Sequence, residues 1–257
     1  MDRALQNLIL ILGIALVLAG GFIGLFGYAG VMYERTLSST YTYEVTVETD
    51  ASLSNVTLFL PLPDNGGRSP VVTDLGRGDV YGLPNGWQTG VYGTGKATFL
   101  KITAGRIEPG YRPAPVPADP EEGPTPAAGV LPVPVPVRLI VEAEADELID
   151  TRCPVGNSTV LLPKVNLTEG RCDFPHELQE PPACYDYETS FFAEYGAAPD
   201  TEVTVSVSLT GSNSWFVFGW SGNEFRDRAV LTLTGESRGW QPAEGSMTTG
   251  VGRYEIL

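Results

Sequence analysis

A long uncharged segment near the N-terminus limits what this chain can fold into. No charged residue occurs between Ala4 and Tyr33, and the 25 residues Leu8–Met32 are all apolar or glycine. A helix of that length extends about 37 Å, which is enough to cross a hydrocarbon core of about 30 Å. The sequence therefore predicts a transmembrane anchor over residues 1–33, followed by a separate domain over residues 34–257.

Two other interpretations of the N-terminal segment remain open. Val17-Leu18-Ala19 resembles the small-residue cleavage site of a signal peptide, but apolar residues continue for 13 positions beyond it. The apolar region of a signal peptide runs for only about 7–15 residues, so the uncleaved anchor is favoured. The third interpretation is a pilin-type leader that is processed at Arg3-Ala4 and exposes a helix that packs into a filament.

The composition of the remaining chain indicates an extracytoplasmic location. Residues 34–257 hold 30 acidic and 15 basic residues, and they account for the whole net charge of −15. Such an acidic surface excludes nucleic acid as a partner, because phosphate binding requires clustered cations. Three Asn-x-Ser/Thr sequences make Asn55, Asn157 and Asn166 candidates for N-glycosylation, although this motif also arises by chance. We therefore expect a single-pass membrane protein with most of its chain outside the cell.

Glycines in the apolar segment lie on one helix face. Gly13, Gly20 and Gly27 recur at heptad spacing, and Gly24 falls on nearly the same face. Small residues on one face let two helix backbones approach closely in lipid. The pattern favours packing of this helix against itself or another membrane protein, although glycine is also generally frequent in such helices.

Beyond the anchor, the chain has the sequence pattern of β-strands. In Tyr41–Glu48, tyrosine and valine alternate with threonine and glutamate, which is typical of a strand with one buried face. Turn residues bound further candidate strands at Val56–Leu62, Ala97–Ala104, Val137–Ala145, Thr159–Leu162, Tyr185–Tyr195, Val203–Leu209, Ser214–Gly219 and Ala229–Thr234. The fold class we expect is mainly β, an antiparallel β-sandwich behind an N-terminal transmembrane helix.

Two segments interrupt this pattern. Residues 66–95 contain nine glycines, and we expect long irregular loops with one short strand there. Residues 109–136 contain ten prolines, which lack the N–H that a central strand needs. This proline-rich segment is either a loop of one sandwich, which we favour, or a linker between two subdomains.

The three cysteines allow one disulfide bond. Cys172 and Cys184 bracket a proline-rich stretch just before a predicted strand, so we favour their pairing in an oxidising compartment. A bond between Cys153 and Cys172 is the alternative, and one cysteine remains unpaired in either case.

No residue pattern supports catalysis or metal binding. Gly235-Glu236-Ser237-Arg238-Gly239 matches the nucleophile elbow of hydrolases, but no helix is predicted after it. The single histidine, His176, precedes the serine, whereas the histidine of that family follows it. One histidine is also too few for a zinc site, and no calcium-loop sequence occurs. We expect a protein that is not an enzyme and has no metal or cofactor.

The densest group of aromatic residues outside the anchor lies in Trp215–Trp220. As a strand, Phe218 and Trp220 share one face and Trp215 lies on the other. A central strand that is buried on both sides is the simpler explanation, because aromatic side chains carry much core energy. The alternative is an exposed aromatic strip in which Trp215, Phe218 and Trp220 bind sugar or another subunit.

Parts of the chain resemble a known group of proteins. The relevant segments are Tyr33-Glu34-Arg35 leading into Ser39-Thr40-Tyr41, the stretch Asn55–Pro63, and Phe218–Asn223. They are similar to uncharacterised membrane-anchored surface proteins of archaea. The resemblance implies a location outside the membrane and assigns no catalytic residue.

Together these features predict a structural or binding component of the cell surface or envelope. Its expected partners are membrane lipid and either a protein, itself or another envelope subunit, or a glycan. The alternatives are a pilin-like filament subunit and an accessory subunit of an extracytoplasmic membrane enzyme complex.

Overall fold

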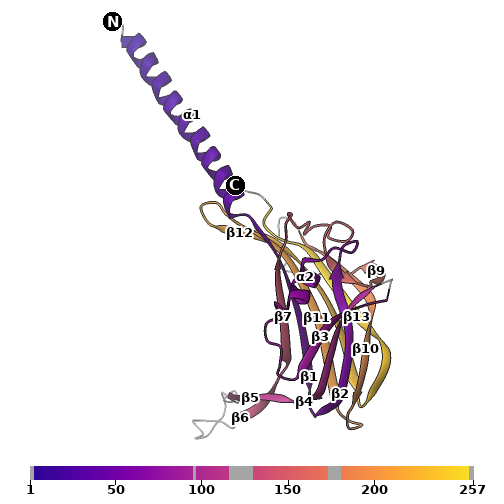
Figure 1. The fold of residues 1–257 in the computed structure, drawn as a ribbon. Helices are drawn as coiled ribbons and strands as arrows, with labels where there is room; N and C mark the ends of the chain where they lie inside the picture. Colours follow the sequence, from indigo (N-terminus) through magenta and orange to yellow (C-terminus); the bar gives the residue numbers. More distant parts are fainter. Residues whose placement is uncertain (1–2, 95–96, 116–129, 173–180, 255–257) are drawn as a thin grey trace.

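A long helix projects from one end of an elongated β-rich body (Figure 1). The structure is a computed structural model that describes residues 3–94, 97–115, 130–172 and 181–254. Most of these residues belong to antiparallel strands, which confirms the predicted class of a mainly β, antiparallel fold behind an N-terminal helix.

The N-terminal helix α1 (Arg3–Thr36) points away from the β-rich body (Figure 1). Its segment Leu10–Thr36 is long and apolar enough to cross a membrane, and the most apolar part of that segment is not buried against the body. Large apolar side chains along it, such as Leu16 and Ile23, are therefore exposed. The C-terminal end of α1 contacts β11.

Eleven strands form one sheet, in the order β3-β4-β2-β10-β13-β12-β11-β1-β7, with β8 paired to β2 and β9 paired to β10. Their bounds are β1 (Ser38–Thr49), β2 (Leu53–Asp64), β3 (Trp87–Gly93), β4 (Thr98–Ile107), β7 (Val137–Glu144), β8 (Val160–Leu162), β9 (Val165–Glu169), β10 (Ala183–Gly196), β11 (Glu202–Phe216), β12 (Trp220–Thr234) and β13 (Ser237–Gly252). Every pairing between them is antiparallel.

The sheet curls until its two ends approach each other. The backbone of Tyr81, which precedes β3, exchanges hydrogen bonds of 2.8 and 2.9 Å with Ile140 of β7. A short helix, α2 (Pro70–Arg77), packs between these ends against β7, β1, β2 and β3. The two faces that enclose the core therefore belong to one curled sheet, and not to two separate sheets.

The alternating sequence pattern decides which side chains face the core. In β1, Tyr41, Tyr43, Val45 and Val47 point inward and are at most 4% exposed, while the intervening threonines and glutamates point outward. Side chains alternate between the two faces of a strand, so one period-2 segment supplies one strip of core. The strips from the strands merge into a single buried cluster.

The prediction of irregular loops is wrong at residues 70–77, where the chain forms helix α2. The Ser69 side chain accepts a hydrogen bond from the Val72 N–H at 3.3 Å, and Pro70 occupies the first turn. Gly78 ends the helix in the left-handed conformation, at φ 85°. Val71 and Leu75, one turn apart, are buried. A helix of eight residues is too short to show a clear helical period in the sequence, so it was not predicted. Strand β3 is the one short strand expected in this region.

The C-terminal strands differ from the prediction in two places. Ser214–Gly219 is not a strand of its own, because β11 continues to Phe216 and residues 217–219 turn the chain into β12. The 16-residue strand β13 was not predicted, since its glycines and Pro242 hide the alternation. At Gly245 a Cβ atom would lie 2.2 Å from the Tyr187 ring. The Tyr187 ring of the neighbouring strand β10 therefore fills the core beside Gly245.

The proline-rich segment forms a ribbon of its own in the described residues. Strands β5 (Gly110–Pro115) and β6 (Val130–Val135) pair only with each other, as a two-stranded sheet. This agrees with the exclusion of prolines from a central strand. Residues 116–129, the middle of the predicted 109–136 insertion, lie outside the described residues.

Candidate functional site

The junction between α1 and the sheet is short and tightly bonded. Helix α1 ends at Thr36 and β1 begins at Ser38, so Leu37 alone connects them. Thr36 Oγ1 accepts a hydrogen bond from the backbone N–H of Phe216 at 2.8 Å and donates one to the Met32 carbonyl at 2.7 Å. The last turn of the helix is thereby attached to the end of β11.

Aromatic rings extend this junction along the helix. The Tyr33 and Trp215 rings meet edge-on with centroids 5.7 Å apart, and the Tyr28 and Phe218 rings lie 6.3 Å apart. Trp215 is buried, whereas Phe218 is 58% and Trp220 72% exposed. The interpretation of this segment as a strand buried on both sides is therefore wrong. We call Phe218 and Trp220, at the turn between β11 and β12, the aromatic tip.

A buried polar network closes the same end of the curled sheet. Asn213 Oδ1 accepts hydrogen bonds from Ser39 Oγ (2.7 Å) and the Ile149 N–H (3.0 Å). Its Nδ2 donates to the Ile149 carbonyl and to Asn223 Oδ1, both at 2.8 Å. Thr151 Oγ1 donates to the same Asn223 oxygen at 2.8 Å. The segment after β7 is thus hydrogen-bonded across the end of the sheet that joins the helix.

Sequence reasoning missed this network, although a signal was present. Asn213 and Asn223 each occupy an inward position of a strand, and they are only 3% and 8% exposed. An asparagine in the buried phase of a strand needs partners for several donors and acceptors. Those partners come from a loop far away in the sequence, which no local pattern reveals.

A buried carboxylate links three elements of the core. Asp227 of β12 accepts a hydrogen bond from the Tyr187 hydroxyl at 2.6 Å and one from the Leu161 N–H at 2.9 Å, and it forms an ion pair of 2.6 Å with Lys164. The side chains of Lys164 and Asp227 are 5% and 0% exposed. Burial lowers the pKa of Lys164, an effect that Asp227 opposes. Burial and the neighbouring Asp227 both raise the pKa of Tyr187. These groups are enclosed in the core, so the arrangement is suited to holding β8 against β12.

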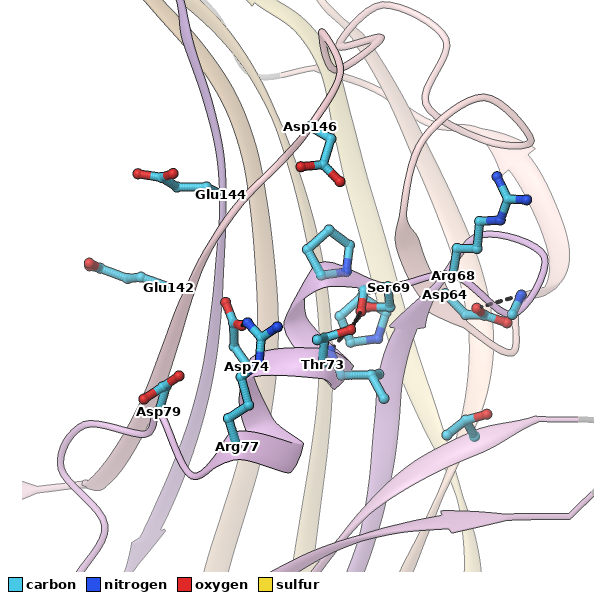
Figure 2. A pocket seen from close by; sticks show the side chains of 15 residues that line it. Asp64, Arg68, Ser69, Thr73, Asp74, Arg77, Asp79, Glu142, Glu144 and Asp146 are labelled. Carbon is cyan, nitrogen blue, oxygen red and sulfur yellow. Dashed lines mark hydrogen bonds and ion pairs between the residues drawn. The ribbon is translucent and has the colours of Figure 1, made fainter.

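An open acidic hollow of about 870 Å³ lies beside α2 (Figure 2). Its carboxylates come from the end of β2, from α2 and the segment after it, and from β7 and the segment after it. They are Asp64, Asp74, Asp79, Glu142, Glu144 and Asp146. Figure 2 shows that Glu142 and Glu144 point away from the side chains of α2, so the carboxylates do not converge on one point. Asp74 pairs with Arg77 at 2.9 Å, and Asp64 accepts a hydrogen bond from the Gly67 N–H.

Within the described residues, no group of three or more His, Cys, Asp or Glu side chains is arranged to hold a metal ion. The hollow is therefore an open, negatively charged surface, and its acidic residues lie apart.

The serine of the hydrolase-like motif directly follows the turn between β12 and β13. Gly235 adopts φ 76°, and Ser237 is the first residue of β13. Its side chain is buried, and its hydroxyl accepts a hydrogen bond from Gln241 Nε2 at 3.4 Å. A nucleophile elbow requires a strand followed by a helix, whereas a strand follows this serine. His176 lies outside the described residues.

The cysteines pair as Cys172 with Cys184, across a Cα–Cα distance of 5.4 Å. Cys153 is free and exposed, so the alternative bond between Cys153 and Cys172 is wrong. The disulfide joins the segment after β9 to the start of β10.

All three candidate glycosylation sites are exposed. Asn55 lies near the start of β2, at φ 53°. The side-chain amide of Asn157 donates hydrogen bonds to Asp150 (2.9 Å) and to the Cys153 carbonyl (3.1 Å). Asn166, on β9, donates to Glu188 at 3.3 Å. Their modification stays a prediction.

The glycine face of α1 is open. A Cβ atom added at Gly13, Gly20, Gly24 or Gly27 would meet nothing within 4 Å. The β-rich body does not occupy this face, which leaves it accessible to lipid or another helix. Helix packing through these glycines stays a prediction.

A second aromatic surface crosses the outer face of the sheet. We define the outer aromatic patch as five residues on β2, β3, β4, β10 and β13, namely Phe59, Tyr92, Phe99, Phe192 and Trp240. Ring centroids within it lie 4.8 to 6.4 Å apart. Trp240 is 48% and Tyr92 46% exposed.

The outer aromatic patch was not predicted from the sequence. Phe59 alternates with the buried Leu58 and Leu60, so the strand pattern placed it on the outer face. The assembly of five strands into one aromatic surface depends on the strand order, which the sequence pattern does not contain.

Comparison with known proteins identifies no family for this chain. No protein family, curated protein or solved structure matches this chain.

Proposed function

We propose that this chain is a single-pass membrane protein whose β domain is held outside the cytoplasm, directly at the membrane surface. The observation that carries the proposal is the junction of α1 with the sheet. An apolar helix of spanning length continues into β1 through Leu37 alone, and its last turn is bonded to β11. The domain therefore follows the orientation of the helix.

Three features support an extracytoplasmic location. The Cys172–Cys184 disulfide fits an oxidising compartment, since such bonds are rare in the cytosol. The candidate glycosylation sites are exposed, and the domain carries the whole excess of acidic residues. The resemblance to membrane-anchored surface proteins of archaea implies the same location.

In this proposal the domain is a structural or binding component of the envelope, and it contacts a protein or a glycan. The outer aromatic patch is the surface that best fits such a contact, because exposed clustered apolar side chains mark interaction sites. Trp240 lies near the start of β13, whose other end, Gly252, is next to β12 near the helix junction. Along a strand this separation is about 40 Å, so the patch lies far from the end of the domain that joins the helix.

The free thiol of Cys153 provides a direct test of the location. Intact cells that express the full chain are treated with a membrane-impermeant maleimide, and the membranes are then extracted with alkaline carbonate. We expect the protein to remain in the membrane pellet and to be labelled at the exposed Cys153. The Cys153→Ser variant is the control, because Cys172 and Cys184 are protected by their disulfide bond.

Two outcomes contradict the proposal. Release of the full-length chain by carbonate rules out the anchor. Labelling that appears only after the cells are permeabilised places the domain in the cytoplasm.

A further inference from the structure

The aromatic tip lies beside the apolar part of α1. The Phe218 ring is 6.3 Å from the ring of Tyr28, and Tyr28 belongs to the candidate membrane span Leu10–Thr36. Glu34, the first charged residue after Arg3, follows Tyr28 by six positions, which is about 9 Å along a helix axis. The aromatic tip therefore reaches past Glu34 and Arg35 toward the level of the apolar part of α1.

The aromatic tip continues the exposed apolar surface of the helix. Phe218 is 58% and Trp220 72% exposed, and neighbouring Tyr28 and Val31 of α1 are 56% and 45% exposed. Leaving such surface in water costs about 25 cal/mol per Å². Trp and Tyr concentrate where a membrane meets water, because their rings are apolar at one end and polar at the other. A lipid interface thus fits both the position and the chemistry of these rings.

The backbone holds the aromatic tip in this position. Strands β11 and β12 are paired without interruption to Phe216 and Trp220, so the turn has no flexible stem. Phe218 adopts φ 54°, a conformation that is uncommon for a bulky residue. The Thr36–Phe216 hydrogen bond and the Tyr33–Trp215 contact make the turn move with α1.

We propose that the aromatic tip inserts into the membrane interface beside α1 and forms a second membrane contact of the domain. This inference rests on the proposed anchoring by α1 and adds to it the depth and orientation of the β domain. Because the body is joined to α1 through Leu37 and the Thr36–Phe216 hydrogen bond, the two tilt together in the bilayer, and a second contact restricts that tilt. The partner of Phe218 and Trp220 is then the lipid bilayer, and not a glycan or another subunit.

Tryptophan fluorescence tests the contact in the full chain reconstituted into lipid vesicles. One variant keeps only Trp220 (Trp87→Phe, Trp215→Phe and Trp240→Phe), and the control variant keeps only Trp240. We expect lipids brominated on their acyl chains to quench Trp220 several-fold more than Trp240. Quenching of Trp220 by aqueous iodide, with no effect of bromolipids, overturns the proposal and leaves the aromatic tip open to a soluble ligand.

A spin label gives the same answer without changing Trp215. In the Cys153→Ser background, Phe218→Cys is labelled and compared with Thr232→Cys, an exposed position farther along β12. We expect the label at position 218 to be more accessible to oxygen than to a water-soluble nickel chelate, and the label at position 232 to show the reverse. Equal preference for the nickel chelate at both positions overturns the proposal.

Flotation of the vesicles separates this inference from the anchor itself. Protein that fails to float with the vesicles shows that anchoring by α1 has failed. Protein that floats while Trp220 and the label at position 218 stay in water shows that only the second contact is absent.

Discussion

The Tyr33 ring meets the Trp215 ring edge-on, with centroids 5.7 Å apart, where the helix joins the sheet. Tyr33 belongs to the last turns of α1 and Trp215 to the end of β11, so this pair links the segment of spanning length to the folded core. Together with the Thr36–Phe216 hydrogen bond, this ring contact makes the helix and the β-rich body move together.

Removing the Trp215 ring is expected to loosen this junction. Trp215 is 3% exposed, and truncation of a buried tryptophan to alanine costs about 3–5 kcal/mol of unfolding free energy. We expect Trp215→Ala to lower the thermal unfolding temperature and to increase proteolysis at Leu37, while Trp215→Phe has a smaller effect. Trp240→Ala is the control, since Trp240 is half exposed. Equal proteolysis of Trp215→Ala and the native chain would show that the ring contact does not hold the junction.

The buried ion pair predicts that a second substitution restores stability that a first substitution removes. Asp227→Ala leaves Lys164 buried without a counter-charge and removes the acceptor of the Tyr187 hydroxyl, which costs about 3–5 kcal/mol. We expect the double variant Asp227→Leu with Lys164→Met to recover part of that loss, because it removes both charges but still leaves the Tyr187 hydroxyl and the Leu161 N–H without their acceptor. Urea unfolding in detergent measures both changes. A double variant that is no more stable than Asp227→Ala would contradict this account.

Alkaline pH is expected to destabilise the fold through buried tyrosines. Burial raises the pKa of Tyr195 from 10 to about 12, and it raises the pKa of Tyr43 further. Between pH 10 and the folded-state pKa, the unfolded chain loses a proton that the folded chain keeps. The free energy of unfolding therefore falls as the pH rises through this range, while the contribution is fully present below pH 10.

The Tyr195→Phe variant tests this mechanism. We expect it to weaken the fall in stability between pH 10 and 12, with Tyr81→Phe as the exposed control. The Tyr195 hydroxyl has no hydrogen-bond partner among the described residues, so its removal should leave stability at pH 7 unchanged or raise it by about 1 kcal/mol. Unfolding measured across this pH range decides the point, and an unchanged slope in the variant argues against it.

The open glycine face of α1 is expected to mediate helix association. A side chain at Gly20 or Gly24 meets no part of this chain, so Gly20→Ile and Gly24→Ile should leave the domain folded. Each should nevertheless reduce association in a membrane two-hybrid assay, because close backbone approach requires small residues. Gly21→Ile, about 100° from Gly20 and about 60° from Gly24 around the helix axis, is the control. Association that survives both substitutions removes the glycine face from the interface.

The outer aromatic patch is expected to contact the envelope partner. A photo-crosslinking amino acid at position 240 should produce a discrete crosslinked species in intact cells. The same amino acid at Glu142, an exposed position on β7 four strands away, should not. Mass spectrometry identifies the crosslinked protein or glycan. Absence of crosslinks at position 240, with normal protein levels, would show that the patch is free of partners.

The local sequence pattern predicted the buried residues correctly in strands that have one apolar face. Tyr41–Val47 and Val203–Leu209 alternate with period 2, and the structure buries those alternate residues in β1 and β11. The pattern failed in β13, where the inward residues Ala243 and Gly245 are small. Gly245 leaves room for the Tyr187 ring of β10, so the alternation there is visible only once both strands are paired.

The sequence by itself determined the apolar helix, the β class, the inward and outward faces of regular strands, and the spacing that brings Cys172 near Cys184. These features depend on residues close together in the chain. Only the tertiary structure decided that Trp215 is buried while Trp220 is exposed, and that Phe59 and Trp240 belong to one surface. Both outcomes depend on how distant segments pack, because the docking of α1 on β11 and the order of the strands bring together residues that no local periodicity relates.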